Sequence, residues 1–309
     1  MDLHLIDPEL RPRYRMFPTL PYHRLSWRPA LRALLRALGH SRPVSGVSVE
    51  THPAGAAQVR LYRPEKGATG AGLLWLHGGG YIVGGASQDD RRCSLFACEQ
   101  GLIVVSVDYR LAPEHPFPAA LTDAHAGWGW LQAHAAELSL DPRRVVLAGE
   151  SAGGGLAACL AQRLYDEGGV QPAAQLLFYP MLDDCTAARP DLDAVNHPAW
   201  NNRSNRAGWS AYLGQSAGEA MTPAYAVAAR RVDLSGLPPA WIGVGELDLF
   251  YDENRCYAEG LQAAGVSCEL VVVPGAPHAF PVVAPDASAS QAFLAHAYRY
   301  LHQTLHLST

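Results

Sequence analysis

Short apolar runs alternate with amphipathic segments along most of this chain. Apolar runs of strand length predict strands at residues 58–62, 72–76, 102–107, 144–148, 175–179, 240–244 and 268–273, with a weaker candidate at 46–51. Helical periodicity predicts helices at residues 88–99, 119–137, 152–167, 252–264 and 287–305. Strands that are apolar throughout and alternate with helices are typical of a mostly parallel sheet that is covered by helices on both faces.

Two stretches interrupt this alternation. Residues 1–45 are rich in proline and arginine, and residues 184–237 hold many asparagines, tryptophans and prolines between two predicted strands. A long insertion at the carboxyl end of a sheet usually covers a site instead of forming its own core. We therefore expect an α/β core of residues 46–183 and 238–309, an N-terminal cap segment of residues 1–45 and a cap insertion of residues 184–237.

The N-terminal segment contains a basic repeat. Arginines recur every four residues and leucines form the opposite stripe, which predicts an amphipathic helix that ends at Gly39. The repeat consists of Arg24, Arg28, Arg32 and Arg36, opposite Leu31, Leu34, Leu35 and Leu38. We expect the leucines to pack on the body of the protein, with a membrane-surface or partner-binding role as the alternative.

Bulk composition narrows the function classes. The 309 residues are 49% hydrophobic and 17% charged, which is enough for a large core, and the net charge of −5 argues against a nucleic-acid-binding protein. No apolar run is long enough for stable membrane insertion, and no secretory signal is visible, so we expect a cytoplasmic protein. The six cysteines include no CxxC pair, which favours reduced thiols over disulfides or metal ligands.

Gly149-Glu150-Ser151-Ala152-Gly153 lies between a predicted buried strand and a predicted buried helix. This order predicts a sharp turn with the serine at its apex, where the helix's first backbone N–H groups are still unpaired. The small residues Gly149, Ala152 and Gly153 leave room for so tight a turn. We therefore interpret Ser151 as a nucleophile.

A serine nucleophile needs a base, a group that orients the base, and donors for the oxyanion. In α/β proteins with a serine at such a turn, the acid and then the histidine follow the serine, each after a later strand. Here two acids, Glu246 and Asp248, follow one later strand, and His278 follows the last strand in a Pro/Gly-rich loop. After the strand at 72–76 comes His77-Gly78-Gly79-Gly80, whose spacing does not fit a phosphate-binding loop. We expect the backbone N–H groups of Gly79, Gly80 and Ala152 to be the oxyanion donors.

Taken together, these motifs resemble hormone-sensitive-lipase-like bacterial esterases (family IV) of the α/β-hydrolase fold. The resemblance spans about residues 55–300 and rests on His77–Gly80, Asp108–Glu114 with Pro116–Ala120, Gly149–Gly154, Asp248 with Asp252 and Glu253, and Pro277–Phe280. It implies an eight-stranded sheet, a helical cap, and hydrolysis of short-chain carboxylic esters without a cofactor. It also implies a triad of Ser151, Asp248 and His278, with Asp248 favoured over Glu246.

The chain departs from the family pattern before the nucleophile, where many members carry aspartate and this chain has Glu150, which we interpret as structural. Tyr81, Trp200 and Trp209 are candidate pocket walls or internal packing residues of the cap. We expect a serine carboxylesterase that acts through an acyl-enzyme. An amidase or deacetylase of acylated amines is the main alternative. A non-catalytic ligand-binding protein is disfavoured because His278 is present. A homodimer through the last strand and helix is implied by the resemblance alone.

Overall fold

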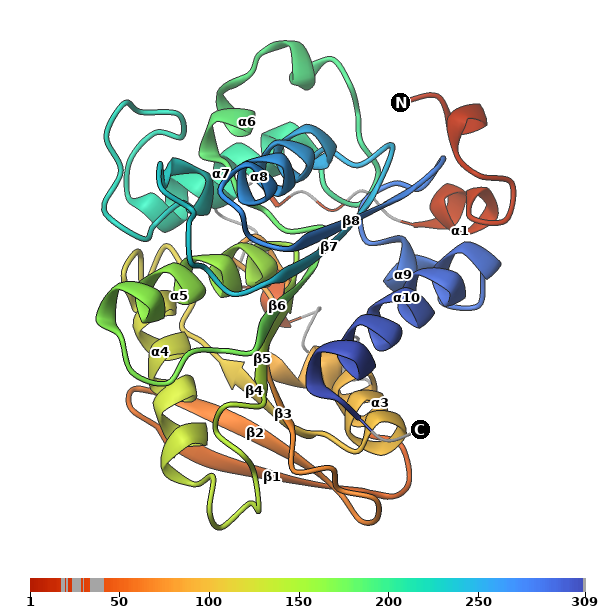
Figure 1. Cartoon of the computed structure of the whole chain (residues 1–309). Coiled ribbons are helices and arrows are strands. Elements are labelled where there is room, and N and C mark those ends of the chain that lie inside the picture. Colours follow the sequence, from red (N-terminus) through yellow and green to blue (C-terminus); the bar gives the residue numbers. More distant parts are fainter. Residues whose placement is uncertain (18–19, 21, 24–28, 30, 34–41, 308–309) are drawn as a thin grey trace.

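The computed structural model describes residues 1–17, 20, 22–23, 29, 31–33 and 42–307. These residues contain an eight-stranded sheet with the strand order β1-β2-β4-β3-β5-β6-β7-β8 (Figure 1). The strands are β1 (Val47–Ala54), β2 (Ala57–Pro64), β3 (Gly72–Leu76), β4 (Ile103–Asp108), β5 (Val145–Glu150), β6 (Ala174–Phe178), β7 (Ala240–Gly245) and β8 (Cys268–Val273). The predicted eight-stranded α/β sheet is therefore confirmed.

The sheet is parallel from β4 to β8 and antiparallel at the other edge, where β2 pairs with both β1 and β4. Parallel strands all point the same way, so their carboxyl ends lie together at one end of the sheet. The loops that follow these strand ends form the usual ligand-binding crevice. The loops that follow β3, β5, β7 and β8 carry the residues singled out by the sequence. The topology thus brings those loops together at the carboxyl ends of the strands.

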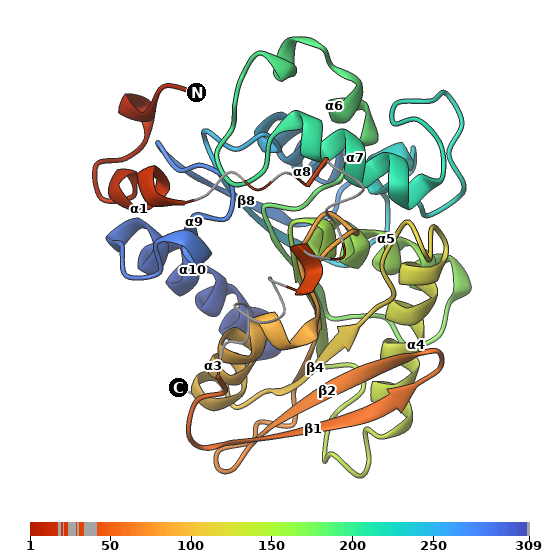
Figure 2. The same ribbon diagram turned by 180° about the vertical axis from the view of Figure 1, so that it is seen from behind.

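Helices cover both faces of this sheet (Figures 1 and 2). Contacts place α4, α5 and α8 against one face and α3 and α10 against the other. The helices are α1 (Arg11–Met16), α3 (Asp90–Gln100), α4 (Ala119–Ala133), α5 (Ala152–Glu167), α6 (Asp184–Ala188), α7 (Asn202–Leu213), α8 (Tyr251–Ala263), α9 (Phe280–Val283) and α10 (Ser288–Leu305).

Strand β3 shows why the strand sequences are apolar throughout. Leu74 and Leu76 belong to the buried cluster on one face, whereas Leu73 and Trp75 belong to the cluster on the other. All four side chains are fully buried because successive side chains of a strand point to opposite faces. Each such side chain stabilises the fold by about 1.5–3 kcal/mol.

Most predicted boundaries agree closely with the structure, but the helix predicted at 119–137 ends at Ala133. Beyond it, His134 bonds back to the carbonyl of Trp130 and the chain continues in turns to Ser139, which has a φ of 52°. Ala135 accepts from the Leu140 N–H at 2.8 Å. These turns redirect the chain toward β5 while keeping its apolar residues buried, so the apolar pattern persists beyond the helix.

The segment 184–237 forms α6 and α7 near the edge where the site loops meet (Figure 2). Most of the predicted helix with Arg24, Arg28 and Arg36 lies outside the described residues. Within it, Leu31 is buried, and Arg32 donates to the carbonyls of Ile82 at 2.7 Å and Ala112 at 2.6 Å.

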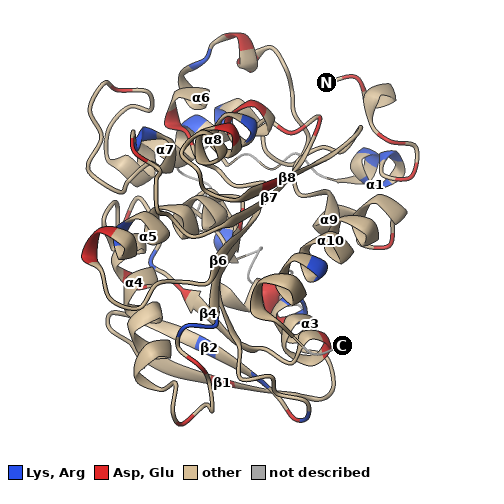
Figure 3. Cartoon of the chain, in the orientation of Figure 1, with Lys and Arg blue, Asp and Glu red and all other residues tan. Residues whose placement is uncertain are grey.

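Acidic and basic residues are interspersed over the outer helices and loops (Figure 3). Among the described helices, none combines the length and apolar character needed to cross a bilayer.

Candidate active site

Ser151 forms the turn between β5 and α5 by itself. Its backbone has φ 52° and ψ −121°, a conformation that costs a non-glycine residue about 1–3 kcal/mol. The Ser151 N–H donates to the carbonyl of Phe178 at 2.9 Å, and the Ser151 carbonyl accepts from the Met181 N–H at 2.9 Å. The adjoining backbone thus holds the serine in a strained position at the carboxyl end of β5.

The two glycines of this turn are required by close backbone contacts. A methyl group on Gly153 would collide with the carbonyl oxygens of Leu76 and His77, and one on Gly149 would collide with the backbone of Gly153. The sharp turn predicted from the sequence therefore depends on the absence of a Cβ atom at both positions.

The loops after β7 and β8 bring a carboxylate and an imidazole to the serine. His278 Nε2 lies 3.0 Å from Ser151 Oγ, and His278 Nδ1 lies 2.8 Å from Asp248 Oδ2. When Nδ1 carries the ring proton and donates a hydrogen bond to Asp248, Nε2 keeps a lone pair that can accept the serine proton. The side chains of His278 and Asp248 are 6% and 0% exposed, so bulk water does not compete for these contacts.

The structure also distinguishes the two acids that follow β7. The second oxygen of Asp248 accepts from the Phe250 N–H at 2.9 Å, which fixes the carboxylate beside His278. Glu246 instead accepts from the Gly275 N–H at 3.0 Å and braces the next loop. Of the two candidates, Asp248 is the one in contact with the imidazole.

Two aromatic rings flank the imidazole of His278. The ring of Tyr179 lies 5.0 Å from it at an interplanar angle of 74°, and that of Phe250 lies 5.1 Å away at 89°. Edge-to-face contacts of this kind stabilise a ring pair by about 0.5–1.5 kcal/mol. Neither residue was predicted from the sequence, where the available signal was only that each follows a strand whose carboxyl end lies at the site.

The loop after β3 forms a glycine-lined cradle. Gly79 and Gly80 have φ values of 124° and 58°, and a side chain at Gly79 would collide with the carbonyl of Val83. Within the described part of the chain, the N–H groups of Gly79, Gly80 and Ala152 donate to no protein acceptor. They are therefore available to a negatively charged ligand atom.

His77 contacts the backbone of this glycine loop. Its ring stacks on Tyr109 with 4.0 Å between centroids, and its Nδ1 lies 2.8 Å from the carbonyl oxygen of Gly78. Burial lowers the pKa of His77, which favours the neutral ring. A neutral imidazole that donates to a loop carbonyl orients the loop.

Residues 73–282 match a family of proteins with the alpha/beta hydrolase fold. The chain belongs to this α/β-hydrolase family.

Similar proteins agree with this assignment. The carboxylesterase NlhH of Mycobacterium tuberculosis is 41% identical over 240 residues, which cover 74% of each chain. The ethyl acetate hydrolase of Pseudomonas putida is 33% identical, over 77% of this chain and 75% of that enzyme. The structure of a bacterial heroin esterase superposes with a TM-score of 0.90 at 35% identity, over 98% of this chain and 99% of that one. The predicted fold, family and enzyme class, a carboxylic ester hydrolase, are confirmed.

The three aromatic residues proposed as pocket walls in this α/β-hydrolase are all buried. The indole of Trp200 lies so close to Gly80 that a side chain there would collide with it. Tyr81 stacks on Tyr212 of α7 at 4.0 Å and lies 5.5 Å from Trp209. Trp200 therefore covers the glycine cradle, whereas Tyr81 and Trp209 pack against each other and against α7.

Glu150, the departure from the family pattern, pairs with a buried arginine. Its Oε2 accepts from Arg92 Nη1 at 2.6 Å and from the Tyr179 hydroxyl at 2.9 Å. The guanidinium also lies 5.7 Å from the ring centroids of both Trp75 and Phe178. Arg92 satisfies the charge of Glu150, which agrees with the structural interpretation. No motif or spacing predicted this partner.

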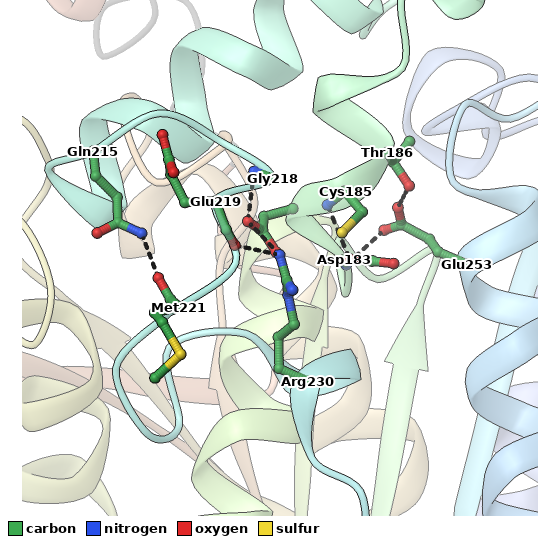
Figure 4. A network of polar contacts seen from close by, with 10 residues as sticks. Asp183, Cys185, Thr186, Gln215, Gly218, Glu219, Met221, Arg230 and Glu253 are labelled. Atoms are coloured by element: carbon green, nitrogen blue, oxygen red, sulfur yellow. Dashed lines mark hydrogen bonds and ion pairs between the residues drawn. The ribbon is translucent and has the colours of Figure 1, made fainter.

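Asp183, Asp184 and Cys185 place potential metal-ligand atoms within 4.8 Å of one another. Both carboxylates already have protein partners. Asp184 pairs with Arg230 at 2.9 Å and accepts from the Gly218 N–H at 2.7 Å, and Asp183 accepts from the Cys185 N–H at 2.9 Å. Figure 4 shows that the Arg230 guanidinium also contacts the carbonyl oxygen of Glu219, at 3.0 Å. The cluster therefore connects parts of the segment 184–237 to one another.

The same network connects the insertion to α8 through Glu253 (Figure 4). Its carboxyl group accepts from the Leu182 N–H at 2.7 Å and from the Thr186 hydroxyl. Burial raises the pKa of Glu253.

Proposed function

We propose that this chain is a serine carboxylesterase with Ser151 as nucleophile, His278 as general base and acid, and Asp248 as the group that orients the imidazole. The observation that carries the proposal is the hydrogen-bonded chain from Ser151 Oγ through His278 to Asp248, with distances of 3.0 and 2.8 Å. This geometry is within the reach that general-base catalysis requires.

In the first step, Ser151 Oγ forms a bond to the ester carbonyl carbon while its proton passes to His278 Nε2. Asp248 stabilises the resulting imidazolium. The imidazolium then protonates the leaving alkoxide, and the acyl group remains on Ser151. In the second step, water gives a proton to His278 Nε2 and its oxygen bonds to the acyl carbon. The imidazolium then returns a proton to Ser151 Oγ as the acyl–serine bond breaks, which releases the carboxylic acid and restores the serine.

The tetrahedral intermediate of each step carries a negative oxygen, which the N–H groups of Gly79, Gly80 and Ala152 bind. Their lack of protein acceptors supports this role. Donors fixed before the reaction lower the barrier because they need no reorganisation, and the loss of one typically lowers kcat by about 10²–10³-fold.

Incubation with a fluorophosphonate probe tests the nucleophile. We expect labelling of Ser151 alone, and loss of labelling together with nearly all ester hydrolysis in Ser151→Ala. Labelling of another residue, or full hydrolysis by Ser151→Ala, contradicts the proposal. The thermal midpoint of each protein shows whether it is folded.

We propose a preference for short acyl chains, since Trp200 closes over the glycine cradle. Its measurement is kcat/KM for p-nitrophenyl esters of increasing chain length. Matched p-nitroanilides then separate an esterase from an amidase or deacetylase. Faster turnover of long-chain esters contradicts the proposed preference for short acyl chains. Faster turnover of anilides than of esters contradicts the assignment as an esterase.

We also propose that residues 1–45 and 184–237 act as a cap over a core of residues 46–183 and 238–309. The contact of Trp200 with Gly80 supports a cap position for the insertion.

The six free thiols support a cytoplasmic location, which cell fractionation tests. A homodimer would use β8, which lies at the edge of the sheet, and sedimentation equilibrium measures it.

A further inference from the structure

Residues 3–16, here called the N-terminal strap, lie against the loop that carries His278 (Figure 1). Ile6, Leu10 and Tyr14 recur every fourth residue and are 1%, 0% and 4% exposed. They belong to the same buried cluster as Phe280 and Phe293, which follow His278 in the chain. Apolar packing therefore seats the strap on the C-terminal part of the core.

Polar contacts then connect the strap to the loop itself. The Asp7 N–H donates to the Gly275 carbonyl at 2.9 Å. The Tyr14 hydroxyl donates to the carbonyl of His278 at 2.7 Å and lies 3.4 Å from that of Pro277. Because burial raises the pKa of Tyr14, helped by the charge of Asp248, its hydroxyl keeps its proton and remains a donor.

The bond to His278 matters because, in the part of the chain that the structure describes, the backbone of this residue makes no other hydrogen bond. Among the described residues, the His278 N–H donates to no acceptor and its carbonyl accepts only from Tyr14. Pro277 has no N–H to contribute. Ser151, in contrast, has both its backbone N–H and its carbonyl bonded to neighbouring backbone.

We propose that Tyr14 is a positioning residue for the reaction, which fixes the main chain of His278 and thereby the distance from Nε2 to Ser151 Oγ. The proposal rests on the proposed role of His278 as general base. The hydroxyl sets the orientation of the His278 peptide group, which in turn directs the Cα–Cβ bond and the ring. A misplacement of about 1 Å at a reacting group can cost about 10²-fold in rate.

The test is Tyr14→Phe, which keeps the buried ring and removes only the hydroxyl. We expect kcat for p-nitrophenyl acetate to fall about 10- to 100-fold with KM unchanged. The rate of fluorophosphonate labelling should fall by the same factor, because it also depends on His278. Amide hydrogen exchange should become faster in the segment 275–283.

Tyr62→Phe is the matched control. Tyr62 is also fully buried, and its hydroxyl donates to Asp90 at 2.6 Å, but it lies in β2. We expect this variant to lose stability with kcat and labelling as in the wild type. The proposal is overturned when Tyr14→Phe behaves in the same way, because the hydroxyl then serves stability alone.

The wild type separates this inference from the proposed function. When wild-type protein is labelled at Ser151 and hydrolyses the ester, but Tyr14→Phe is labelled just as fast, only the role of Tyr14 fails. When wild-type protein is neither labelled nor active, the proposed function fails and the role of Tyr14 fails with it.

Discussion

The turn that carries Ser151 and the loop that carries His278 lie 3.0 Å apart at their reactive atoms, yet they are held in place differently. The serine turn is held by the strand and helix on either side of it and by backbone bonds. The histidine loop has backbone bonds at Gly275 and Ala276. His278 itself, in contrast, is contacted by side chains from distant elements, namely Tyr14, Tyr179 and Phe250.

This difference teaches how the two halves of the site should respond to change. A substitution in the serine turn meets backbone that cannot move, so it should cost stability first. A substitution around the histidine loop removes a support, so it should cost rate while the fold remains. The following predictions test that division, from the largest expected effect to the smallest.

Asp248→Asn should have the largest effect, on the histidine side. The amide keeps an oxygen for the Phe250 N–H, but it no longer favours the ring tautomer with a proton on Nδ1. We expect kcat to fall about 10⁴-fold with little change in thermal midpoint. Activity within about 10-fold of wild type would falsify the assignment of Asp248 as the orienting acid.

Gly153→Ala tests the serine side. Its methyl group meets two backbone carbonyls, so we expect a loss of about 1–3 kcal/mol or more in the free energy of unfolding, measured with urea. Gly129→Ala is the control, because it lies in α4 with no atom near the added methyl group. It should raise stability by up to about 1 kcal/mol. Equal losses in both variants would show that the turn is not sterically tight.

Phe250→Leu returns to the histidine loop with a milder change. Loss of the edge-to-face contact, about 0.5–1.5 kcal/mol, should lower kcat by up to about 10-fold with an unchanged KM. Phe293→Leu, in the buried core below, should reduce stability and leave kcat unaltered. If both variants behave alike, Phe250 contributes packing only.

The smallest effect concerns pH. Burial lowers the pKa of His77 below its ordinary value of about 6.5, so the unfolded chain binds more protons there than the folded chain as the pH falls. Stability should therefore decrease below about pH 6.5, by at most about 1.4 kcal/mol per pH unit for this one group. His77→Gln should flatten the slope of unfolding free energy against pH between 5 and 6.5. An unchanged slope would rule out His77 as its origin.

The same comparison explains how far the sequence can be interpreted. The strand–turn–helix around Ser151 was predictable because its whole signal is contiguous, and α5 begins and ends at its predicted residues. His278 was predictable from its place after the last strand, but the order of the strands left both Glu246 and Asp248 open. The family resemblance favoured Asp248. Tyr14 was not, because its partner lies 264 residues away and a tyrosine hydroxyl gives no spacing pattern. Arg92, whose partner Glu150 lies 58 residues away, escaped for the same reason.

The strap pairs Tyr14 with a residue 264 positions later in the chain, and this has a consequence for synthesis. A ribosome releases residues 3–16 well before residues 275–293, which form their binding surface. The nascent chain can therefore fold its central strands long before the base can meet the nucleophile. Hydrolytic competence should arise only after residues 275–293 have emerged, and a shorter nascent chain should stay inert toward the esters around it.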